Sequence, residues 1–135
     1  MRKERLVVVG NGMAGMHCLE QILAHGPHFD VTVFGDETHV NYNRIMLSSV
    51  LAGEKVADDI VINGRDWYAK HGIDLRVGVR IVDVDAGSRT VTGNDGSVTP
   101  YDLLLLATGS HAFMPPIQGL DKDGVFAFQI GRAHV

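Results

Sequence analysis

A glycine-rich run at residues 10–15, Gly-Asn-Gly-Met-Ala-Gly, has the spacing that binds the pyrophosphate of a dinucleotide. It lies between a run at 5–9 that is apolar after Arg5 and a pattern typical of a helix. In that setting Gly10 allows a tight turn, Gly12 lets phosphate oxygens approach the backbone, and Gly15 lets the helix pack closely on a sheet. A helix N-terminus carries partial positive charge and unpaired N–H groups, which suit an anion. The run therefore predicts nucleotide binding at this turn.

Acidic residues follow the second predicted strand, where a carboxylate commonly binds the ribose of an adenosine. That strand is expected at 31–34, and Gly35 stands directly after it. Asp36 and Glu37 are therefore displaced by one or two residues from the usual position. Either carboxylate is expected to reach the ribose, and the alternative for each is a solvated loop charge.

The strand, helix and strand that position these residues are predicted from hydrophobic patterning. The run at 5–9 is aliphatic after Arg5 and is bounded by glycine, which is typical of a buried strand. A helix is expected from 12 to about 24, with Gly15, Cys18, Leu19 and Ile22 facing the core. With the strand at 31–34 these elements form a βαβ unit, whose strands pair in parallel.

The chain then departs from a simple repeat of that unit. A plain nucleotide-binding fold would place a crossover helix where turn residues instead join short runs of strand formers. The expected elements are one or two helical turns within 45–51, a helix at 63–70 capped by Asn63, a strand at 73–77, a β-meander of three strands at 79–84, 89–92 and 98–101, and a strand at 103–106. The last strand is fully apolar, so we expect it to be central in its sheet.

Composition excludes several classes of protein. The chain has 135 residues, room for one domain, and a formal net charge of −4 without the basic stripe of a nucleic-acid binder. The apolar run near the N-terminus is too short for a signal peptide or a membrane span, so we expect a cytoplasmic protein without a membrane partner. Cys18 is the only cysteine, and the histidines lack metal-ligand spacing, so we predict no metal site.

The turn Ala107-Thr108-Gly109, taken with the β-meander, narrows the class of protein that the chain resembles. It resembles the FAD domain of the two-dinucleotide-domain, FAD-dependent pyridine nucleotide oxidoreductases. The resemblance implies an α/β fold: a Rossmann-like FAD-binding domain with a parallel sheet and a small antiparallel β-meander. It implies FAD as the cofactor, with the backbone of this turn close to it. A plain nucleotide-binding module and a simple NAD-dependent dehydrogenase are the alternatives from other classes.

The stretch at 41–48, Asn-Tyr-Asn-Arg-Ile-Met-Leu-Ser, narrows the resemblance. With the glycine-rich run, Asp-Trp-Tyr at 66–68 and Tyr-Asp at 101–102, it is similar to the N-terminus of the NAD(P)H-dependent assimilatory nitrite reductase large subunit. The resemblance implies that Arg44 lies against FAD. The disulfide-reductase branch of these enzymes needs a redox cysteine pair near this position. No cysteine occurs within 41–51, which excludes that branch. The residues predicted to bind the cofactor are Gly10, Gly12, Met13, Ala14, Gly15, Asp36, Glu37, Arg44, Ser48, Ala107, Thr108 and Gly109.

The nitrite reductase resemblance implies a complete enzyme larger than this chain. In it, a hydride passes from NADH or NADPH to FAD, and electrons then pass through an iron–sulfur cluster to sirohaem, where nitrite is reduced. We expect residues 1–129 to be the FAD-binding domain, the remainder of the polypeptide to be its partner, and 130–135 to be a non-native tail. No catalytic residue is predicted within the chain, which should be inactive alone. A flavoprotein reductase of a small electron carrier such as rubredoxin is the alternative in the same class.

Overall fold

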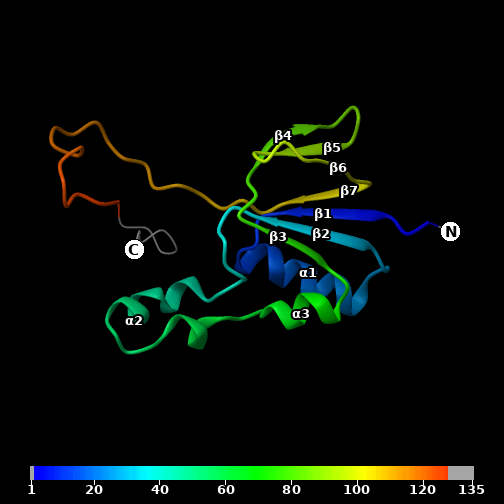
Figure 1. Cartoon of the computed structure of the whole chain (residues 1–135), viewed down its shortest axis with the longest axis horizontal. Coiled ribbons are helices and arrows are strands. Elements are labelled where there is room, and N and C mark those ends of the chain that lie inside the picture. Colours follow the sequence, from blue (N-terminus) through cyan, green and yellow to red (C-terminus); the bar gives the residue numbers. More distant parts are fainter. Residues whose placement is uncertain (1, 128–135) are drawn as a thin grey trace.

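A computed structural model of the chain describes residues 2–127 (Figure 1). The elements in chain order are β1 (Arg5–Val9), α1 (Met13–His25), β2 (Asp30–Gly35), the 3-10 helix η1 (Arg44–Met46), α2 (Leu47–Leu51), the 3-10 helix η2 (Ala57–Ile60), α3 (Arg65–Lys70), β3 (Asp74–Val77), β4 (Ile81–Asp85), β5 (Thr90–Gly93), β6 (Val98–Pro100) and β7 (Leu103–Leu106). The predicted tail at 130–135 lies outside the described residues.

Within the described range the strands form two sheets. The first is four-stranded in the order β3-β2-β1-β7, and every pairing in it is parallel. The second is three-stranded and antiparallel in the order β4-β5-β6. The predicted βαβ unit and β-meander are therefore both confirmed, and the chain has the α/β fold that the sequence predicts.

The parallel sheet is covered on both faces, which explains why β1 is apolar from Leu6 to Val9. Helices α1 and α3 lie on one side of the sheet and strands β4–β6 on the other (Figure 1). Leu6 and Val8 pack in the cluster that includes residues of the two helices, whereas Val7 and Val9 pack in the cluster that includes Val91 of β5. Successive strand side chains point to opposite faces, so a strand between two layers needs apolar residues at every position.

Strand β7 is not central, contrary to the prediction. Within residues 2–127 it pairs with β1 and stands at the edge of the parallel sheet. The Leu103 and Leu106 side chains are 45% and 59% exposed. An apolar composition indicates faces that need cover, but it does not report how many strands lie beside the strand.

Two further details of the sequence prediction were wrong. Asn63 does not cap α3, because Gly64 holds that position, and the buried Asn63 side chain instead bonds with Asn41 and Glu20. On α1, Met16 is fully buried, while Cys18 is only half-buried. Met16 lies three residues before Leu19 and therefore shares its core face, which the predicted stripe missed.

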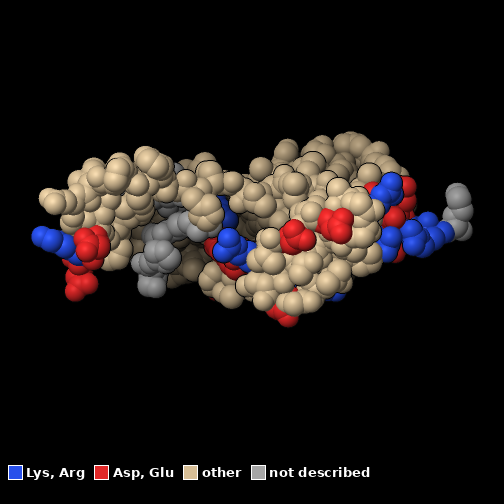
Figure 2. All heavy atoms as spheres, turned by 90° about the horizontal axis from the view of Figure 1, so that it is seen from above, with Lys and Arg blue, Asp and Glu red and all other residues tan. Residues whose placement is uncertain are grey.

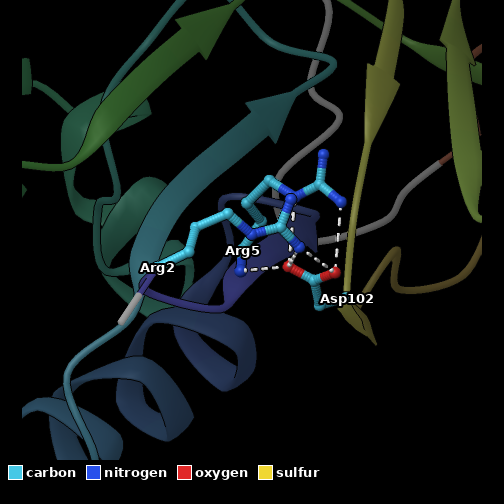
Figure 3. Close-up of polar contacts among 3 residues, drawn as sticks. All are labelled: Arg2, Arg5 and Asp102. Atoms are coloured by element: carbon cyan, nitrogen blue, oxygen red, sulfur yellow. Dashed lines mark hydrogen bonds and ion pairs between the residues drawn. The ribbon is translucent and has the colours of Figure 1, made fainter.

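Asp102 ties the N-terminus to the start of β7 (Figure 3). Its carboxylate accepts hydrogen bonds from the Arg5 backbone N–H at 2.8 Å, from Arg5 Nε at 3.0 Å and from Arg2 Nη2 at 3.1 Å. These hydrogen bonds hold the pKa of Asp102 well below its ordinary value, and the side-chain bond from Arg5 has the largest effect. The contact joins the first and last strands at the edge of the sheet opposite the glycine-rich turn.

We expect Asp102→Asn to lower stability at neutral pH and to matter less in acid. The lowered pKa means that Asp102 stabilises the fold above its unfolded-state pKa of about 3.9, and that this contribution is lost as the pH falls below that value. Urea midpoints at pH 7 and pH 3 measure the effect. Asp74→Asn is the control, since its ion pair with Arg76 is more exposed and should contribute little. An equal loss at both pH values for Asp102→Asn would contradict the prediction.

Candidate functional site

A pocket of about 370 Å³ lies at the carboxyl ends of β1, β2 and β7, beside the N-terminus of α1. Ligands of open α/β sheets bind at this edge. The residues that line it are Gly10, Asn11, Gly12, Met13, Ala14, Gly35, Asp36, Glu37, His39, Tyr42, Arg44, Ala107, Thr108, Gly109 and Ser110. Three stretches far apart in the sequence thus meet at one place.

The turn after β1 is packed directly on the turn after β7. Gly10 has a φ of +113°, and a Cβ built on it would lie 2.0 Å from the carbonyl oxygen of Ala107. The Gly10 N–H donates to the Phe34 carbonyl at 2.8 Å, and the Ala107 N–H donates to the Val9 carbonyl at 2.8 Å. Gly10 is therefore required both by its backbone conformation and by the close approach of the second turn.

The first turn of helix α1 lies at the pocket and presents backbone groups to it. Its N-cap is Gly12, which has extended dihedrals of −94° and 180°, and within the described residues no side chain caps the helix. No acidic residue lies in the first turn. The opening N–H groups and the helix dipole therefore offer a site for an anion. Gly15 lies behind this turn, where a Cβ would be 2.9 Å from the Gly10 carbonyl oxygen and 3.0 Å from the Ala107 Cβ.

Charged and aromatic side chains form the opposite wall. Arg44 Nη2 lies 2.8 Å from Glu37 Oε1, and the Tyr42 hydroxyl donates to Glu37 Oε2 at 2.7 Å. The Arg44 guanidinium carbon also lies 5.2 Å from the centroid of the Tyr42 ring, within cation–π range. Burial and then the hydrogen bond to Glu37 raise the pKa of Tyr42 to about 12, so its hydroxyl keeps its proton at neutral pH.

The structure gathers most of the predicted cofactor residues around this pocket. Ten of the twelve line it, whereas Gly15 packs behind the turn and Ser48 lies exposed on α2, away from the lining. Asp36 and Glu37 both line the pocket, so the choice between them as the ribose partner stays open. Whether these residues bind a cofactor stays a prediction.

Sequence reasoning did not count Asn11, Gly35, His39, Tyr42 and Ser110 among the cofactor residues, although they line the same pocket. For Tyr42 the sequence showed only its position two residues before Arg44, and the structure supplies the backbone conformation that makes this spacing informative. Asn43 has extended dihedrals of −76° and 99°, and extended backbone places residues i and i+2 on one side. Tyr42 therefore shares the side of Arg44.

The described residues contain no cluster of three or more histidine, cysteine, aspartate or glutamate side chains arranged to hold a metal ion. Among the helices of the same residues, none has the length and apolar character needed to cross a membrane. Lys and Arg side chains are interspersed with Asp and Glu on the face drawn in Figure 2.

A known protein family matches almost the whole chain. Residues 4–133 match the family described as "Pyridine nucleotide-disulphide oxidoreductase". The match includes the glycine-rich turn, both walls of the pocket and the β-meander.

Two proteins of Bacillus subtilis (strain 168) are similar over 96% of the chain. An "Assimilatory nitrate reductase electron transfer subunit" is 48% identical, and a "Nitrite reductase [NAD(P)H]" is 47% identical. The chain spans only 17% and 16% of the length of these relatives.

Among solved structures, NADH:rubredoxin oxidoreductase from Clostridium acetobutylicum aligns with a TM-score of 0.79 and 28% identity. The alignment covers 90% of this chain and 32% of that protein. The chain therefore shares the architecture of one part of that oxidoreductase.

Proposed function

The chain belongs to the pyridine nucleotide-disulphide oxidoreductase family, and from this membership we propose that residues 1–129 form an FAD-binding domain. The observation that carries the proposal is the junction of the glycine-rich turn, the N-terminus of α1 and the Arg44 wall around one pocket. An uncapped helix N-terminus and an arginine are the groups that bind a pyrophosphate.

The residues present fit a dinucleotide with its pyrophosphate at Gly12. A Cβ on Gly12 would point into the space beside Arg44, 3.9 Å from its Nε and Nη2 atoms. Glycine therefore keeps open the gap between the helix N-terminus and the guanidinium. We assign the pyrophosphate to Gly12, Met13, Ala14 and Arg44, and the adenosine ribose to Asp36 or Glu37.

The turn at 107–109 would lie along the remainder of the cofactor. Its strand β7 is paired with β1, so the turn is fixed beside the glycine-rich run. When bound, FAD supplies the chemistry, by accepting a hydride and releasing electrons. The chain's own part is to bind and orient the dinucleotide, and Ser48, which lies off the pocket, is the weakest member of the predicted set.

We infer that the whole protein is a nitrite reductase of the NAD(P)H-dependent type, with the nicotinamide, iron–sulfur and sirohaem sites in other parts of its polypeptide. The similarity to the B. subtilis nitrite reductase favours this candidate. The similarity to an electron transfer subunit of nitrate reductase and to a rubredoxin reductase favours an electron-transfer flavoprotein instead. Reading the gene beyond the codon for Gln129 decides between them. Cysteine clusters suited to iron–sulfur and sirohaem ligation support nitrite reductase, and a frame that ends after a second nucleotide domain contradicts it.

The remainder of its own polypeptide is the partner that we propose for the exposed apolar surface. Leu103 and Leu106 on the edge strand are exposed, and so are Phe113 and Phe126 in the segment after β7, at 84% and 75%. Large apolar side chains exposed in this number mark a surface that another segment covers. The short share of the relatives' length that this chain spans agrees with that proposal.

FAD binding tests the proposal directly. We expect the 135-residue chain to quench the fluorescence of added FAD in a saturable titration, and ADP to compete because it shares the pyrophosphate and the adenosine. FMN has only one phosphate and no adenosine, so it is the matched control and should bind much more weakly. Equal affinity for FAD and FMN would contradict a dinucleotide site.

The loaded chain should not oxidise NADH or NADPH faster than free FAD does. The chain has one glycine-rich nucleotide turn, at 10–15, which we assign to FAD. NADH consumption, followed by absorbance with and without the chain, measures this. Oxidation above the free-flavin rate would refute the inactivity of the isolated chain and leave FAD binding intact.

A further inference from the structure

Tyr68 of α3 reaches from the core to the glycine-rich turn. Its side chain is 2% exposed and packs in the cluster between the parallel sheet and the helices. Its hydroxyl donates to Asn11 Oδ1 at 2.5 Å, across 57 positions of sequence. Asn11 stands between the two glycines that shape the proposed pyrophosphate site.

Asn11 is held on its other side as well. Its Nδ2 donates to the His39 carbonyl oxygen at 3.3 Å. Its Cβ lies 3.0 Å from the place where a Cβ on Gly35 would stand, so β2 ends in close contact with it. One side chain thus connects the turn after β1, the loop after β2 and helix α3.

The neighbourhood of Tyr68 is itself fixed by buried hydrogen bonds. Asn41 Nδ2 donates to Asn63 Oδ1 at 2.7 Å, and Asn63 Nδ2 donates to Glu20 Oε1 on α1 at 2.9 Å. Asn41 and Asn63 are 2% and 3% exposed. This network joins the segments before and after the Arg44 loop to α1. Among the described residues the buried Asn41 Oδ1 has no hydrogen-bond partner, so the network rests on these two hydrogen bonds.

We propose that Tyr68 is a positioning residue for the dinucleotide site, holding the turn at 10–12 in its binding shape through Asn11. The proposal rests on the proposed function, because the shape matters for a bound pyrophosphate. The contact selects one orientation of Asn11, and the orientation of Asn11 sets the backbone between Gly10 and Gly12. A residue of α3 that does not line the pocket therefore controls the affinity of the site.

The contact also persists over a wide pH range. Burial is the largest effect on the Tyr68 hydroxyl, and it raises the pKa of that group above its ordinary value. The hydroxyl therefore stays protonated, and able to donate to Asn11, throughout the physiological range.

The test compares Tyr68→Phe, Asn11→Ala and the double variant in the 135-residue chain. The readout is hydrogen exchange of the Gly10 and Met16 amides, which donate to the Phe34 and Gly12 carbonyls. Tyr101→Phe is the matched control, since Tyr101 is a buried tyrosine of the other cluster and lies outside the pocket lining. FAD affinity is measured on the same proteins.

We expect either single variant to speed exchange of both amides and to raise the Kd for FAD by about three- to tenfold. The double variant should add nothing to the effect of Asn11→Ala, which breaks the contact with Tyr68 and also the hydrogen bond to the His39 carbonyl. Tyr101→Phe should leave both quantities unchanged. If Tyr68→Phe does not fold, Asn11→Ala removes the same contact from the pocket side.

Additive effects of the two substitutions, or unchanged exchange in both, would overturn the positioning role. The exchange readout needs no ligand, so it separates this proposal from the proposed function. Absence of FAD binding by the unsubstituted chain would refute the proposed function. Faster exchange confined to Tyr68→Phe and Asn11→Ala would still establish the contact.

Discussion

Replacing Gly10 with alanine is expected to unfold the chain or to lower its free energy of unfolding by at least about 3 kcal/mol. Two penalties combine at this position. The φ of +113° is strained for any residue with a Cβ, and that Cβ would lie 2.0 Å from the Ala107 carbonyl oxygen. The Ala107 backbone cannot move away without breaking its hydrogen bond to Val9, which continues the pairing of β7 with β1. Urea denaturation followed by circular dichroism measures the loss.

Gly53→Ala is the matched control for the backbone strain. Gly53 also has a positive φ, +78°, but no atom lies within 4 Å of a Cβ built there. We expect Gly53→Ala to cost only about 1–2 kcal/mol, the penalty of the left-handed conformation alone. If both variants lost the same stability, the close approach of the turns after β1 and β7 would add nothing to the cost of a Cβ at Gly10.

Most of the fold was predictable because its signals are local. The alternation of strand and helix patterns, and the turn residues within 79–101, predict the βαβ unit and the meander without any knowledge of distant contacts. The position of β7 was not predictable in this way. Four successive leucines indicate faces that need cover, whereas the number of paired neighbours depends on which other strands reach that edge.

Asn63 shows the same limit at a single residue. Asparagine just before a helix commonly caps it, so local propensity predicted a cap. Inside the protein Asn63 Oδ1 instead accepts from Asn41 Nδ2, and Asn63 Nδ2 donates to Glu20 of α1. Buried polar groups need partners, and this tertiary requirement outweighed the local preference.

The candidate site likewise contains residues that local patterns predicted and residues that they did not. The glycines were found from spacing, because each has a backbone reason to be glycine. Arg44 was found from a resemblance, and its ion pair with Glu37 joins two predicted residues. Tyr68 was not predicted as a site residue, since the contact of its hydroxyl with Asn11 spans 57 positions and leaves no periodic signal.

Gly12→Ala is expected to lower FAD affinity about 10- to 100-fold while the fold is kept. The extended backbone at Gly12 suits any residue, and the nearest atoms to an added Cβ, on Arg44, are 3.9 Å away. The methyl group would nevertheless occupy the gap in which we place the pyrophosphate. Fluorescence titration with FAD measures affinity, and urea midpoints measure stability.

Gly64→Ala is the control that distinguishes the effect of changing a helix N-cap from the effect of blocking the ligand. Gly64 is the N-cap of α3, with extended dihedrals of −74° and 166° and open space around a Cβ, so it shares the N-cap position and extended backbone of Gly12 but lies outside the pocket lining. Alanine is a poor N-cap, and both variants should lose a similar stability of about 1 kcal/mol. Only Gly12→Ala should weaken FAD binding. If FAD affinity fell equally in both, the loss would come from the weakened fold, and if it fell in neither, the pyrophosphate would not lie between Gly12 and Arg44.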